Sequence, residues 1–176
     1  LFDALQEGGA RERTIIVVTA DHGEAFGEKD ELRHGFFAYD NTLHIPFFLD
    51  VPRAPPATVA ENASHIDIFP TVCDLLGIAV PPQVQGESLL PLIAGAGRRK
   101  KPIYFESLAP SFSMGGAPLT GFIRGDLKFI DQPIKEVYDL AADPGEETNI
   151  AAGSDVAALE KELAELKKSL KGPGTT

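Results

Sequence analysis

The stretch that most constrains the fold is the apolar, β-branched run TIIVVTA at residues 14–20, which ends on Asp21, His22 and Gly23. A continuous apolar run without alternation is typical of a strand buried on both faces, as in a parallel sheet covered by helices. Ligands collect at the carboxyl ends of strands in open α/β sheets. The sequence therefore predicts a buried strand that brings two polar side chains to a ligand-binding edge.

The rest of the first half fits the same layered pattern. Residues 1–7 resemble the end of a helix stopped by two glycines, and residues 21–43 form a charged, glycine-containing loop. A second apolar strand is expected at residues 44–51. A helix with Asp67 as its N-cap follows. Strand, loop, strand and helix in this order predict the α/β class.

The composition changes after residue 95. The basic connector GAGRRKK at 95–101 is followed by short aromatic segments that predict an antiparallel sheet, with a tight hairpin at Gly125-Asp126. Residues 155–172 have the apolar spacing of an amphipathic helix. We therefore expect an α/β part at 1–95, a small antiparallel-sheet subdomain with a helix at 96–172, and a disordered tail at 173–176.

The charge and the cysteine content exclude some classes of binding partner and of covalent cross-link. The chain of 176 residues has a net charge of −10, which argues against nucleic acid and anionic membranes and is compatible with cation binding. Its one cysteine, Cys73, is expected in the core of a helix and excludes an intrachain disulfide. No apolar run approaches the ~20 residues that span a bilayer, and the first residues lack the pattern of a signal peptide.

Asp21 and His22 are candidate ligands of a divalent cation, because a carboxylate and an imidazole make half of a coordination shell. Gly23 allows the chain to leave the strand, so that two adjacent side chains can serve one site. The alternative is that Asp21 caps a turn and His22 packs beside it.

A second His-Gly pair favours the functional interpretation. A loop tethered at a strand's carboxyl end can fold back, so His34 can reach the same pocket and bind an anionic substrate oxygen or assist a leaving group. A direct metal role is the minor alternative for Glu24. The acidic residues between the two histidines are expected to form a solvated loop face: Glu24, Glu28, Asp30 and Glu31.

Several motifs, in order along the chain, resemble the sulfatases of the alkaline phosphatase superfamily. Residues 14–52 resemble the family's second metal-site segment, with the strand, Asp-His-Gly, a Gly-Glu loop, His-Gly and YDNTLHIP. The further matching segments are SHIDIFPTVCDLLGI (64–78), VQGESLLPLIAG (84–95), FIRGDLKFI (122–130) and EVYDLAADPGEETNIA (136–151). The resemblance covers most of residues 14–170.

The resemblance implies a fold and a set of roles. The fold would be part of an alkaline-phosphatase-like α/β/α sheet, followed by a small antiparallel sheet and a C-terminal helix. Asp21 and His22 would bind one divalent cation, calcium in most sulfatases and zinc or manganese in phosphotransferring relatives. His34 would contact the sulfate or phosphate oxygens.

The family's nucleophile has no counterpart in this sequence. In sulfatases it is a formylglycine made from Cys/Ser-x-Pro-x-Arg, and in phosphotransferases a threonine or serine. The family's first Asp-Asp metal pair is also absent. The resemblance therefore implies the C-terminal portion of a sulfatase that is inactive without its N-terminal half, which is its first expected partner. A homodimer through an exposed sheet edge is a second expectation. The parent's compartment is left open among periplasmic, secreted and membrane-attached.

Two alternatives remain. One is a phosphatase, phosphonate hydrolase or phosphoethanolamine-type transferase of the same superfamily, and the other is a non-catalytic binding module with a degenerate site. Among the remaining polar residues, structural or surface roles are expected for His44 in a strand, His65 before a helix, and Arg124 and Lys128 beside the hairpin. The glycine- and serine-rich loop at 107–119 either borders the substrate pocket or is a connector.

Overall fold

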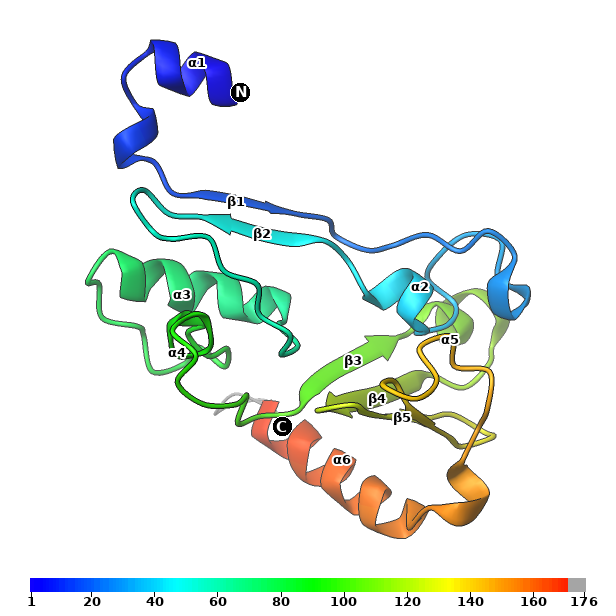
Figure 1. Ribbon diagram of the computed structural model, residues 1–176. Coiled ribbons are helices and arrows are strands. Elements are labelled where there is room, and N and C mark those ends of the chain that lie inside the picture. Colours follow the sequence, from blue (N-terminus) through cyan, green and yellow to red (C-terminus); the bar gives the residue numbers. More distant parts are fainter. Residues whose placement is uncertain (171–176) are drawn as a thin grey trace. The chain divides into compact units, whose positions relative to one another are not determined.

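The computed structural model describes residues 1–170 (Figure 1). The chain divides into two compact units, Leu1–Ala57 and Thr58–Thr176, which are described separately. The expected tail at 173–176 and the last two residues of the expected helix lie outside the described residues. The expected domain division at residue 95 stays a prediction.

The first unit carries two short strands and short helical segments. Its elements are α1 (Phe2–Glu7), the 3₁₀ turn η1 (Arg11–Arg13), β1 (Ile16–Thr19), the 3₁₀ turn η2 (Glu28–Asp30), α2 (Asp40–Leu43) and β2 (Phe47–Asp50). α1 ends at Gly8, as the glycine pair predicted. Between η2 and α2, and before η2, the chain is irregular, as expected for the loop at 21–43.

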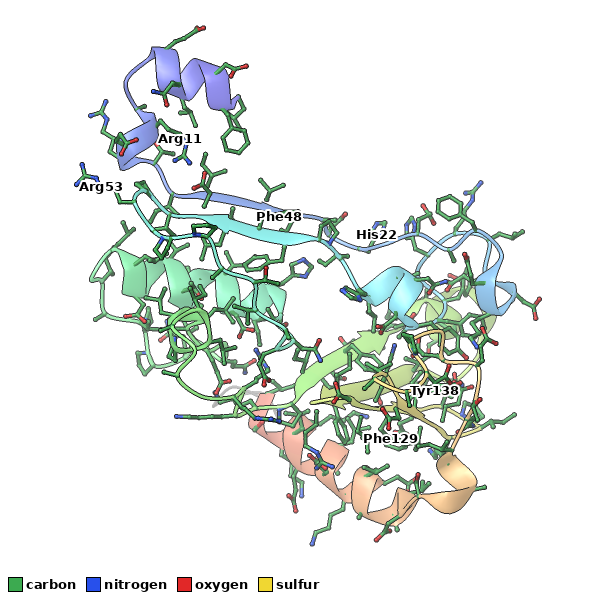
Figure 2. The ribbon with its side chains drawn as sticks, viewed as in Figure 1. Arg11, His22, Phe48, Arg53, Phe129 and Tyr138 are labelled. Carbon is green, nitrogen blue, oxygen red and sulfur yellow. The ribbon has the colours of Figure 1, made fainter. Side chains whose placement is uncertain are left out.

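The two strands of the first unit pair antiparallel, with Val18 opposite Phe48. The expected burial of β1 on both faces in a parallel sheet is therefore wrong for the described residues. The exposed fractions are 44% for Val18 and 64% for Phe48, so one face of this ribbon is open. Phe48 is labelled on β2 in Figure 2. The apolar run indicates a strand with apolar side chains to bury. Its periodicity does not determine whether the neighbouring strand is parallel or antiparallel.

The second unit contains a four-stranded antiparallel sheet in the order β3-β4-β5-β6. Its elements are η3 (His65–Asp67), α3 (Ile68–Leu75), α4 (Leu90–Ile93), β3 (Ile103–Ser107), α5 (Ala109–Met114), β4 (Leu119–Arg124), β5 (Leu127–Asp131), β6 (Glu136–Asp139), η4 (Ala151–Gly153) and α6 (Val156–Leu170). β4 and β5 form the predicted hairpin, and Gly125 adopts a φ of 57° in its loop. The predicted α/β class, with a small antiparallel sheet and a C-terminal helix, is confirmed.

α6 covers one face of this sheet (Figure 1). Phe122, Phe129 and Val137 are fully buried on that face and pack against Leu159 and Leu163 of the helix. The two phenylalanine rings meet edge to face with their centroids 5.9 Å apart, a favourable aromatic geometry. Across residues 1–170, no helix has both the length and the apolarity needed to cross a membrane.

A buried carboxylate organises the start of α3. Asp67 is the N-cap of α3, as expected, but its side chain makes no capping bond to that helix. Its carboxylate instead forms a capping box with Ser64, the N-cap of η3. The Asp67 carboxylate accepts hydrogen bonds from Ser64 N at 2.8 Å and Glu87 N at 2.9 Å, and it forms a buried ion pair with Arg99. Gly86 is required in this arrangement, because a Cβ there would lie 1.9 Å from Ile66 O.

The sheet face opposite α6 holds a second buried ion pair. Lys128 was expected at the surface, but its side chain is 0% exposed and its Nζ lies 2.6 Å from Glu146 Oε1. The ammonium also lies 5.7 Å from the centre of the Phe105 ring. Arg124 is exposed, as expected, and forms an ion pair with Glu162 of α6.

Removal of Glu146 should leave a buried, uncompensated ammonium. We expect Glu146→Ala to lower the free energy of unfolding by roughly 3–5 kcal/mol in urea denaturation. Glu165→Ala, at an exposed position of α6, is the matched control and should change it by less than about 0.5 kcal/mol. The double variant Lys128→Met/Glu146→Leu should recover most of the loss. Equal effects of Glu146→Ala and Glu165→Ala would contradict a stabilising pair.

Candidate metal and anion site

The chain leaves β1 through a tight contact with α2. Gly23 N donates to Thr42 O at 2.8 Å, and a Cβ on Gly23 would lie 2.2 Å from Asn41 O. A glycine is therefore required here by the close approach of two backbones. This contact places the Asp21-His22 pair directly at the end of the strand, next to α2.

Asp21 and His22 direct acceptor atoms toward the same space. His22 Nδ1 lies 2.7 Å from Gly23 O, and since a carbonyl oxygen only accepts, Nδ1 carries the proton. The other ring nitrogen, Nε2, lies 3.6 Å from Asp21 Oδ2. In the neutral ring this Nε2 has a free lone pair, so two electron-rich atoms converge, which is the arrangement that a cation stabilises. Figure 2 shows His22 just beyond the end of β1.

The Asp21 carboxyl is fully exposed and is held in its ionised form. Hydrogen bonding from its own backbone N–H is the main cause that lowers the pKa of Asp21; the His22 ring, where it is protonated, and the His22 backbone N–H lower it further. An ionised carboxylate is the form that binds a metal ion. Protonation of Asp21 therefore does not compete with cation binding near neutral pH.

The loop after Gly23 folds back as a narrow hairpin. Ala25 N donates to Arg33 O at 2.8 Å, and Gly27 N donates to Glu31 O at 2.9 Å. Lys29 and Asp30 form its tip in the left-handed region, with φ values of 53° and 60°. In this pairing Phe26 lies opposite Leu32; their exposed fractions are 83% and 79%, whereas Ala25 and Glu31 on the other face are buried.

The hairpin brings His34 onto His22. The two imidazole rings stack with centroids 3.8 Å apart and an angle of 28° between their planes. His34 Nδ1 lies 3.1 Å from Glu24 Oε1. The predicted return of His34 to the Asp21-His22 pair is therefore what the structure shows, while the roles of the three residues stay predictions.

The acidic residues of the loop do not form one solvated face. Glu31 is buried and its Oε1 accepts from Phe36 N at 2.9 Å and Phe37 N at 3.3 Å, so the expectation of a solvated Glu31 is wrong. Glu28 is exposed, and its carboxylate accepts from Phe26 N at 2.6 Å, which lowers its pKa. These two carboxylates stabilise the hairpin through backbone N–H groups.

The pairing of Glu24 with His34 was the main feature missed from the sequence. Both residues are equally distant from Lys29, so a hairpin centred there would have paired them. The tip is Lys-Asp, however, and lacks the Asn-Gly or Asp-Gly signal of a short hairpin.

The other histidines lie outside this cluster. His44 follows α2 as its C-cap, not within a strand as expected, and is exposed, with Nδ1 3.8 Å from Asp40 Oδ2. His65 opens η3 in the second unit. Cys73 is buried in α3, as expected. The loop at 107–119 contains α5, and its expected border with the substrate pocket stays a prediction.

Asp21 and His22 fit a divalent cation as two ligands of an incomplete shell. Bonds of ~2.0–2.6 Å from nitrogen and oxygen to such ions allow one ion to span the 3.6 Å between Nε2 and Oδ2. Within residues 1–170, no three His, Cys, Asp or Glu side chains are arranged to hold a metal ion. Further ligands would therefore have to come from elsewhere.

The family model and the curated relatives that match this chain are sulfatases. The family model described as Sulfatase matches residues 1–78. The chain is 31% identical to the N-acetylglucosamine-6-O-sulfatase of Bacteroides thetaiotaomicron, in an alignment that covers 94% of this chain and 31% of the relative. The chain is thus similar to sulfatases over nearly its whole length.

Solved structures show the same relationship. One protein, solved in complex with its substrate D-glucosamine-2-N,6-O-disulfate, is 28% identical with a TM-score of 0.74, over 96% of this chain and 36% of that chain. The phosphonate monoester hydrolase of Agrobacterium radiobacter is 29% identical with a TM-score of 0.71, over 96% and 37%. The chain thus spans about a third of the length of these relatives, consistent with a C-terminal portion of a sulfatase-family protein.

Calorimetry with calcium, zinc and manganese tests whether Asp21 and His22 bind a divalent cation. We expect weak binding of one cation, with a dissociation constant on the order of 10⁻³ M, the weak end of protein calcium sites. Asp21→Ala should abolish binding, because it removes the charged ligand. Asp30→Ala removes an exposed carboxylate from the same loop and should leave the affinity unchanged. Equal binding by wild type and Asp21→Ala would exclude Asp21 as a ligand.

Proposed function

We propose that this chain contributes half of the active site of a metal-dependent sulfatase that hydrolyses sulfate esters. The observation that carries the proposal is the convergence of Asp21, His22 and His34 at the end of β1, with the two imidazoles stacked 3.8 Å apart. The family relationship supports the reaction class, and the named sulfate-ester hydrolases among the relatives support the substrate class.

Each of the three residues has a distinct role. Asp21 and His22 hold one divalent cation, for which calcium is the first choice. When bound, such an ion polarises the ester oxygens and steadies the nucleophile. His34 contacts the anionic ester oxygens and assists departure of the leaving group.

The nucleophile belongs to the missing N-terminal half, where we expect a formylglycine and the remaining metal ligands. Cys73, the one cysteine of the chain, is buried in α3 and does not fit this role. The chain alone is therefore inactive, and the first partner is the N-terminal half of the same protein. Homodimerisation through the open β1–β2 ribbon, and a periplasmic, secreted or membrane-attached parent, stay predictions.

A second candidate is a phosphatase, phosphonate hydrolase or phosphoethanolamine-type transferase. The resemblance to a phosphonate monoester hydrolase supports it, since that protein is as similar to this chain as the sulfatase structures are. The imidazole of His22 also suits zinc or manganese better than calcium. In this case His34 would contact phosphate or phosphonate oxygens.

The longer protein that contains this chain should distinguish the two activities. We expect turnover of nitrophenyl sulfate with kcat/KM above that for nitrophenyl phosphate and a phenyl phosphonate, and no turnover of any of them by the 176-residue chain. Preference for phosphate or phosphonate would favour the second candidate. Absence of all three activities, with the metal bound, would favour a non-catalytic binding module.

His34→Ala in the longer protein tests the anion contact. Loss of a group that binds the ester oxygens and assists the leaving group should lower kcat/KM for the preferred ester by roughly 10²–10⁴-fold. The control is His44→Ala, which removes an exposed imidazole outside the cluster and should leave kcat/KM unchanged. Equal rates for His34→Ala and wild type would rule out this role.

A further inference from the structure

We propose that Glu24 is a positioning residue for His34: its carboxylate holds the imidazole by Nδ1 and leaves Nε2 to face the substrate. The inference rests on the proposed function of His34. Glu24 Oε1 and His34 Nδ1 are 3.1 Å apart, and both side chains are exposed, with exposed fractions of 41% and 43%.

The chemistry of the pair assigns the proton. An ionised carboxylate has only acceptor atoms, so the hydrogen of this bond must belong to His34 Nδ1. A histidine whose Nδ1–H is bound by a carboxylate has Nε2 as its working nitrogen, as in the histidine of a catalytic triad. In the imidazolium form this Nε2 donates a hydrogen bond to an anionic ester oxygen, and in the neutral form it is an acceptor. Glu24 therefore determines which ring atom is presented to the ester.

Two contacts in different directions restrain the ring of His34. The carboxylate binds one edge within the ring plane, and the His22 ring lies against one face at 3.8 Å. Stacking alone would still allow the imidazole to turn within its own plane. The hydrogen bond from Glu24 removes this freedom, so one nitrogen has a defined direction.

Glu24 acts on the orientation of His34 and not on the hairpin itself. The backbone bonds that close the hairpin join Ala25 to Arg33 and Gly27 to Glu31, and neither uses the Glu24 side chain. Removal of the carboxylate should therefore leave the loop folded. Glu28 is the suitable control, because its carboxylate binds a backbone N–H of the same hairpin.

The pairing can be measured in the chain itself by ¹⁵N NMR of the histidine rings, at a pH where His34 is neutral. We expect wild type to show the Nδ1–H tautomer at His34. Glu24→Ala should shift the ring toward the Nε2–H tautomer, whereas Glu24→Gln, whose amide oxygen still accepts, and Glu28→Gln should retain Nδ1–H. An unchanged tautomer in Glu24→Ala would overturn the inference, whatever reaction the longer protein catalyses.

Kinetics of the longer protein supply the second measurement. Glu24→Ala should lower kcat/KM for nitrophenyl sulfate about 10–100-fold, the loss typical when an outer carboxylate partner of a functional histidine is removed. Glu24→Gln should restore most of that loss, which a merely structural defect would not allow. Wild-type rates for Glu24→Ala would overturn the inference.

Cation affinity distinguishes a positioning residue from a ligand. Calorimetry should show that Glu24→Ala keeps the affinity that Asp21→Ala loses, and equal losses would overturn the inference by making Glu24 a ligand. If the longer protein hydrolyses no sulfate ester, the proposed function fails, and the NMR result still decides whether Glu24 orients His34.

Discussion

The candidate site depends on the close approach of two backbones at Gly23. Its N–H bond to Thr42 O, and the 2.2 Å that a Cβ would leave to Asn41 O, fix the direction in which the chain leaves β1. Any side chain at this position would separate α2 from the strand end. The orientation of Asp21 and His22 follows from this exit, and the start of the returning hairpin is set by it too. The absence of a Cβ at Gly23 therefore determines whether the side chains of Asp21 and His22 can act together.

The second unit is organised by buried charges instead. The Asp67–Arg99 pair joins the start of α3 to the basic connector, and the Lys128–Glu146 pair joins β5 to the segment before η4. Burial of ions carries a desolvation penalty that mutual attraction offsets only with good geometry and further hydrogen bonds. Asp67 has these additional bonds from two backbone N–H groups. Each pair joins segments that are distant along the chain.

Local signals were readable from the sequence, and partners distant along the chain were not. The hairpin at Gly125 and the return of His34 follow from turn chemistry and loop tethering, and both are present. The antiparallel pairing of β1 was missed, because an apolar run does not encode its neighbour. Lys128 was expected at the surface, since its acidic partner Glu146 lies eighteen residues away and depends on the path of the chain. The burial of Glu31 was not predicted, because its partners are backbone N–H groups and every residue type other than proline has one.

The number of residues in the hairpin at the site determines which side chains lie on the same face. Side chains alternate between its two faces, so Glu24 and His34 share a face only in the observed pairing of the two arms. A slip of one residue, or one residue inserted at the Lys29-Asp30 tip, would move one arm's side chains to the opposite face. The left-handed backbone of both tip residues accommodates the present loop length. The role proposed for His34 thus depends as much on whether the number of residues between positions 24 and 34 is even or odd as on the chemical identity of the two residues.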